Sequence, residues 1–135
     1  MISIIEYFGP WMHHSAVTEE VMDNAGHLLE CVDRLMAYAI EDMVTLPINP
    51  VTNSQVSGEK YGGFRPPECT QGSPSSSHKR GQGVDVYDPH NDLDEWITDE
   101  MLEECGLYRE HPTATQHWCH LTTRAPGSGH RTFLP

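Results

Sequence analysis

The chain has 135 residues, of which 20 are acidic and 8 basic, so its formal net charge is −12. This charge argues against duplex nucleic acid and anionic membrane surfaces as main partners, because basic surfaces bind both. No apolar run approaches the ~20 residues of a membrane-spanning helix. The N-terminus has neither the basic start nor the apolar length of a secretory signal. We therefore expect a single domain, residues 1–135, that is synthesised in the cytoplasm without a signal peptide.

Residues 1–45 are expected to form an N-terminal arm and one long helix. Residues 1–14 are rich in aromatics but show no clear period. From Thr18, which suits a helix N-cap, apolar residues recur at steps of three and four up to Met43. Pro47 and Pro50 lie beyond the end of this pattern. We interpret the apolar stripe as core.

Residues 46–135 hold the remaining elements. Residues 46–76 are dense in Gly, Pro, Ser and Asn, which predicts short strands joined by tight turns and then an ordered loop. A strand is predicted at 83–88, "GVDVYD", where alternation puts Val84 and Val86 on one face and Asp85 on the other. A second strand is predicted at 117–124, "HWCHLTTR", with Trp118 and His120 on one face.

Between these strands, residues 92–106 are predicted to form one helix. Asp92 and Glu95 have the spacing of a capping box, and Gly106 suits the C-cap. The expected buried face is Leu93, Trp96, Ile97 and Met101. The element order predicts an α+β fold with a small antiparallel sheet packed on helices.

The four cysteines, at positions 31, 69, 105 and 119, form no C-x-x-C pair, so a zinc ribbon is not expected. We interpret them as small buried hydrophobic residues.

Asp85 is unusual because it interrupts a run that otherwise reads as a buried strand. A buried carboxylate is costly unless it is paired or bound to a metal ion. His120 lies on a predicted strand, and His78 lies in the loop before Asp85. Two histidines and a carboxylate are the ligand types of a catalytic zinc site. From the residues alone two alternatives stay open: Asp85 pairs with Arg65 or Lys79, and His120 is an ordinary core histidine.

Three segments carry a resemblance to a known family. "SSHKRGQGVDV" resembles the S-x-H-x-x-G-x-A-x-D signature of the zinc D-alanyl-D-alanine carboxypeptidases, with Gly83 in place of the usual alanine. "HWCHL" resembles the W-x-H strand of that family, and "GGFRPPE" resembles its upstream arginine segment. The family includes phage cell-wall endopeptidases and shares its fold with the Hedgehog signalling domain. The resemblance covers about residues 55–135.

The resemblance implies that His78, Asp85 and His120 hold Zn²⁺. It also implies that Arg65 binds a substrate carboxylate or the developing oxyanion, although Arg65 is equally suited to a structural ion pair. Many relatives carry an acidic residue where this chain has His117. Glu110 lies a loop earlier and is the favoured general base, with His117 as the alternative.

Three hypotheses follow. The first is a zinc peptidase that acts on peptidoglycan stem peptides, is encoded by a phage or prophage, and works in the bacterial cell envelope or is carried in a phage particle. The second is a non-enzymatic structural or virion protein of the same fold that keeps zinc for stability. The third is a small structural protein without metal.

Trp118 either lines the substrate cleft or packs in the core, and His90, His111 and His130 are expected on the surface.

Overall fold

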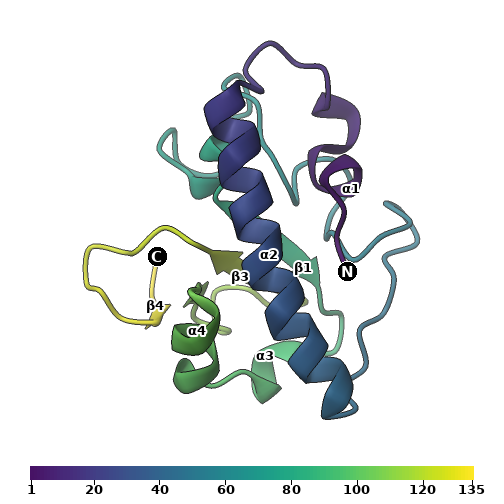
Figure 1. The fold of residues 1–135 in the computed structure, drawn as a ribbon, viewed down its shortest axis with the longest axis vertical. Helices are drawn as coiled ribbons and strands as arrows, with labels where there is room; N and C mark the ends of the chain where they lie inside the picture. Colours follow the sequence, from purple (N-terminus) through teal and green to yellow (C-terminus); the bar gives the residue numbers. More distant parts are fainter.

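The computed structural model describes all residues from 1 to 135 and shows an α+β fold built on a four-stranded mixed sheet (Figure 1). The strand order is β1 (Gly83–Tyr87), β3 (Trp118–Thr122), β2 (Tyr108–Glu110), β4 (Thr132–Phe133). β3 is antiparallel to both neighbours, whereas β4 is parallel to β2. The expected purely antiparallel sheet is thus wrong at one edge, because the chain reverses after β3 and then pairs beyond β2.

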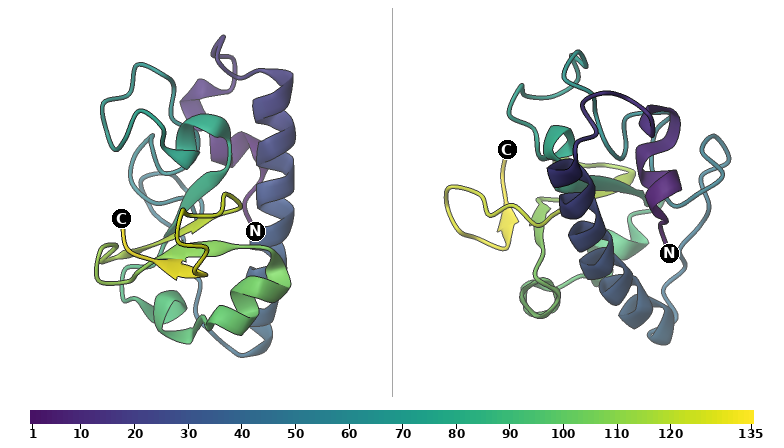
Figure 2. Two further views of the ribbon diagram at one scale, coloured as in Figure 1. Left: turned by 90° about the vertical axis from the view of Figure 1, so that its left-hand side faces the viewer. Right: turned by 45° about the horizontal axis from the view of Figure 1, so that its top comes forward.

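The long helix α2 (Glu19–Glu41) lies across one face of this sheet (Figures 1 and 2). Its N-cap is Thr18, as predicted, and the Thr18 side chain accepts a hydrogen bond from the backbone N–H of Val21. The buried stripe of α2 joins the inward residues of β1 and β3 in one core, and each such side chain contributes ~1.5–3 kcal/mol relative to exposure. Met43 lies beyond the helix and is 89% exposed, so the predicted stripe is too long at its end.

The N-terminal arm is helical, which its sequence did not reveal. It forms α1 (Ile4–Phe8), with a capping box between Ser3 and Glu6, and the 3₁₀ turn η1 (Gly9–Trp11). Tyr7 and Phe8 are buried, and the Tyr7 hydroxyl donates to the carbonyl of Gly83 at 2.9 Å. A helix of five residues is too short to show a period, but it ties the N-terminus to the first residue of β1.

Residues 46–76 form an ordered loop rather than the expected strands. They contain only isolated bridges, such as Val56 with Val86. The loop nevertheless pairs with the outer edge of β1, since the Asp85 N–H donates to the Gly62 carbonyl at 2.7 Å and the Ser57 N–H donates to the Asp85 carbonyl at 2.8 Å. Backbone groups at this edge are therefore satisfied without a further strand.

The predicted helix at 92–106 is two helices, α3 (Asp92–Trp96) and α4 (Asp99–Cys105). The chain is extended at Ile97, and the Thr98 side chain caps α4. The expected capping box of Asp92 and Glu95 is wrong. The carboxylate of Asp88 instead accepts from the first turn of α3, at 3.0 and 2.9 Å.

The structure confirms other expectations about residues 92–106 and about the cysteines. Gly106 is the left-handed C-cap of α4. Leu93 and Ile97 are buried, while Trp96 and Met101 pack partly buried against the core. All four cysteines are free and buried. None of the helices combines the length and the apolar character needed to cross a membrane.

Candidate metal centre

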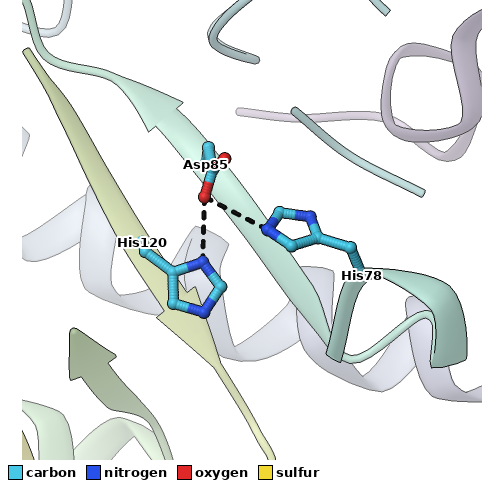
Figure 3. A group of neighbouring side chains, drawn as sticks. All are labelled: His78, Asp85 and His120. Carbon is cyan, nitrogen blue, oxygen red and sulfur yellow. Dashed lines mark hydrogen bonds and ion pairs between the residues drawn. The ribbon is translucent and has the colours of Figure 1, made fainter. Parts of the chain in front are cut away.

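Asp85 and His120 face each other across the pairing of β1 and β3 (Figure 3). Val84 and Val86 point into the core beneath α2, so the alternation of the strand places Asp85 on the opposite face. In the antiparallel register Asp85 is the direct partner of His120, and the Nδ1–H of His120 donates to Asp85 Oδ1 at 2.8 Å. The alternation read from the sequence places both side chains on one face, and the register between β1 and β3 brings the pair together.

His78 reaches the pair from the 3₁₀ turn η2 (Ser77–Arg80), which precedes β1. Ser76 caps the turn and Gly81, at φ 74°, ends it in the left-handed conformation. His78 Nε2 lies 3.3 Å from Asp85 Oδ1 (Figure 3). One ligand atom from each of His78, Asp85 and His120 lies within 4.8 Å of the others, which is close enough for all three to bind one metal ion.

The tautomer of His78 follows from its other ring nitrogen. Nδ1 lies 2.7 Å from the carbonyl oxygen of Gly63, which can only accept, so Nδ1 carries the proton. Burial lowers the pKa of His78, even though the charge of Asp85 raises it, and this favours the neutral ring. Nε2 then presents a lone pair to a carboxylate oxygen. Two acceptors that face each other at this distance call for a cation between them, which is either a proton on Nε2 or a metal ion. A backbone acceptor on the far nitrogen is the usual support of a metal-binding histidine.

Asp85 is ionised in this setting. Burial by itself raises the pKa of Asp85, but the positive charge of His78 when Nε2 is protonated and the hydrogen bond from His120 outweigh burial and hold the pKa well below its usual range. The second oxygen, Oδ2, pairs with Arg65 Nη2 at 3.3 Å. The ion pair with Arg65 that the sequence left open is thus present together with the histidine contacts. Lys79 takes no part in it and donates to the carbonyl of Pro67.

The three candidate ligands line a cavity of about 470 Å³. Arg65, Glu110 and Trp118 line the same cavity. Glu110 is the last residue of β2, and burial raises the pKa of its carboxyl group, with the negative charge of Asp85 adding to the effect. Cavities of a few hundred Å³ with convergent polar groups are typical of small-molecule and peptide sites.

His117 does not line this cavity. It is exposed, at φ 80°, in the turn before β3, and its Nδ1–H donates to the carbonyl of Pro89 at 3.1 Å. His90 and His130 are exposed as expected, whereas His111 is partly buried. Of the two general-base candidates, only Glu110 therefore shares a cavity with the candidate ligands.

The cavity also contains residues that the sequence did not single out, among them Ser77, Arg124 and Phe133. Arg124 lies just after β3, and its guanidinium donates to the carbonyl of Ser75 at 2.6 Å. Ser77 begins the short turn η2, Arg124 is in a loop, and Phe133 is in the short edge strand β4. No periodic pattern marks such positions, so only the packing of the chain reveals them.

The residues fit a divalent metal ion. Two imidazoles and a carboxylate supply three donors once His120 releases the Nδ1 proton that it donates to Asp85, as ligands do when they bind a metal ion. The carboxylate is ionised, and His78 Nε2 faces it. Comparisons of this chain with protein-family models, with curated proteins and with solved structures find no match.

Proposed function

We propose that this protein is a zinc-dependent peptidase that hydrolyses peptide bonds in peptidoglycan stem peptides. The observation that carries the proposal is the convergence of His78, Asp85 and His120 in one cavity with a carboxyl group and a guanidinium group. Zn²⁺ suits this donor set, because catalytic zinc sites have three N or O protein ligands and one open position. The signature at residues 76–85, which resembles that of the D-alanyl-D-alanine carboxypeptidases, supports the substrate class. The C-terminal segment, residues 118–135, resembles the tail of phage-encoded members and supports a phage or prophage origin.

When bound, Zn²⁺ supplies Lewis-acid chemistry that activates water and polarises a carbonyl group. Glu110 acts as the general base that takes a proton from the attacking water and returns it to the leaving amine. Its raised pKa suits this role, since a base works best when its pKa approaches the working pH. Arg65 has one nitrogen on Asp85 and another near the Gln71 carbonyl, so it is held rigidly on the cavity wall. There it binds substrate oxygens through charge-assisted hydrogen bonds.

The test combines metal analysis with cleavage of purified peptidoglycan. We expect about one zinc ion per chain, removable by a chelator, and release of stem-peptide fragments by the zinc-loaded protein. Glu110→Gln is the isosteric variant and should abolish cleavage while it keeps the metal. His117→Ala is the control, because His117 lies outside the cavity, and it should cleave at the wild-type rate.

Each result has a distinct meaning. Cleavage by Glu110→Gln together with inactive His117→Ala would move the role of base to His117. Bound zinc without cleavage by the wild-type protein would favour the alternative proposal, a structural or virion protein that uses zinc for stability. Absence of bound zinc would reject both.

A further inference from the structure

The candidate metal centre lies at the junction of two cavities rather than at the blind end of one. The second cavity, of about 450 Å³, shares Arg65, Asp85 and Trp118 with the first. We call the first the arginine arm, after Arg124, and the second the aromatic arm, after Tyr61 and Trp118. A ligand bound at the centre can thus extend in both directions.

The arginine arm contains a positive charge without a carboxylate partner. Arg124 belongs to none of the ion pairs in the molecule. Its guanidinium is nevertheless held in place by the Ser75 carbonyl, and its backbone N–H donates to Thr122 Oγ1 at 3.0 Å. The loop that holds it is rich in serine, and Ser73, Ser76 and Ser77 line the same arm.

No acidic residue that lines this cavity forms an ion pair with Arg124. Of the two acidic residues that line this arm, Asp85 is already paired with Arg65 and the two histidines, and Glu110 is on β2 without an ion pair to any base. The chain has only 8 basic residues against 20 acidic ones. One of these basic residues, Arg124, lies on this cavity wall without a carboxylate partner. A guanidinium on the wall of a cavity that three serines also line is suited to bind a carboxylate.

The aromatic arm has a different character. Its one unshared acid, Glu59, is adjacent to its one unshared base, Lys60. The Lys60 ammonium lies 5.4 Å from the centre of the Tyr61 ring, which itself stacks on Trp11. Tyr61 and Trp118 thus provide aromatic surface in an arm with balanced charge, which suits an uncharged stretch of peptide.

We propose that the substrate is an acidic peptide bound in both arms, with one of its carboxylates on Arg124 and its uncharged part in the aromatic arm. The bond that is cut then lies inside the peptide and not at its C-terminus. This inference rests on the proposed peptidase function, and it adds the specificity residue, Arg124, and the endopeptidase mode.

Binding is measured by calorimetry on zinc-loaded Glu110→Gln protein, so that turnover does not interfere. The probes are soluble muropeptides with free carboxylates and the same muropeptides after chemical amidation. We expect Arg124→Ala to weaken binding of the carboxylate form about 10- to 100-fold, because a hydrogen bond to a charged group is lost. Binding of the amidated form should not change, and Arg124→Lys should restore part of the loss. Arg34→Ala is the control with the same change in net charge, since Arg34 is exposed on α2 and lines neither arm.

The site of cleavage is read by mass spectrometry on otherwise wild-type protein with muropeptides whose C-termini are blocked. Cleavage of the blocked peptides supports the endopeptidase mode, whereas release of single residues from free C-termini only would overturn it. Equal binding of the carboxylate form by Arg124→Ala and by the parent protein would overturn the role of Arg124, even if cleavage is intact. Absence of both binding and cleavage would instead refute the underlying peptidase function, and the inference with it.

Discussion

Replacement of Gly63 by alanine is expected to weaken metal binding although Gly63 is not a ligand. The Gly63 carbonyl accepts the Nδ1–H of His78 at 2.7 Å and so keeps the lone pair of Nε2 directed at Asp85. A Cβ atom on Gly63 would lie 1.9 Å from the carbonyl oxygen of Tyr7 and 2.9 Å from its carbonyl carbon. Both are backbone atoms of α1 and no side-chain rotation relieves the overlap, so the segment that carries the Gly63 carbonyl must shift.

Two costs follow from this shift. Overpacking of a well-packed interior destabilises a protein by ~1–3 kcal/mol. Loss of the hydrogen bond that orients a metal-binding histidine lowers metal affinity ~10- to 100-fold, which is about 1.4–2.8 kcal/mol at ~1.4 kcal/mol per factor of ten. We therefore expect the Gly63→Ala variant to unfold at lower urea concentration without metal, and to bind zinc at least tenfold more weakly.

The assay is zinc competition against a chromophoric chelator, with urea unfolding of the metal-free protein in parallel. Gly26→Ala is the matched control, because Gly26 lies within α2 and a Cβ there would meet nothing within 4 Å. It should stabilise the protein by ~0.5–1 kcal/mol and leave zinc affinity unchanged. If the Gly63→Ala variant binds zinc as tightly as the wild type and unfolds at the same urea concentration, the Gly63 carbonyl does not orient His78.

Three further outcomes are expected. Tyr7→Phe removes the hydrogen bond to the Gly83 carbonyl and should cost ~1 kcal/mol in urea unfolding; an unchanged midpoint would contradict this. Zinc at ~100 times its Kd should stabilise the wild type by ~2.7 kcal/mol in thermal unfolding, and a His120→Ala variant that gains as much would exclude His120 as a ligand. Burial raises the pKa of Asp94 from 3.8 to about 6, so its contribution to stability is full below pH 3.8 and is lost as the pH rises through about 6. The introduced asparagine side chain of the Asp94→Asn variant does not titrate. The free energy of unfolding of the variant should therefore rise relative to that of the wild type by ~3 kcal/mol between pH 3 and pH 8, at ~1.4 kcal/mol per pKa unit. A difference between the two proteins that stays constant with pH would refute the raised pKa of Asp94.

Periodic patterns in the sequence were enough to predict α2, β1 and β3 and the face on which Asp85 and His120 lie. The apolar stripe from Thr18 predicted α2, and the alternation around Asp85 and around His120 predicted β1, β3 and the shared face of these side chains. These predictions succeed because each depends only on neighbouring residues and on the repeat of a helix or strand.

Other features depend on contacts between residues far apart in sequence, and only the tertiary structure decided them. α1 is held by burial of Tyr7 and Phe8, and the parallel pairing of β4 depends on where the C-terminal segment meets β2. Whether Glu110 or His117 lies near the candidate ligands likewise follows from the pairing of β2 with β3 and from the left-handed turn at His117.

The residues around the candidate metal centre likewise divide into those that the sequence predicts and those that it does not. His78 and Asp85 could be predicted together because they are close in sequence and fall on one short segment that resembles a family signature. The carbonyl of Gly63 and the guanidinium of Arg124 could not, because every residue has a carbonyl and an arginine in a loop follows no period. Local periodicity determines which face of an element a side chain occupies, whereas the packing of separate elements determines which faces meet.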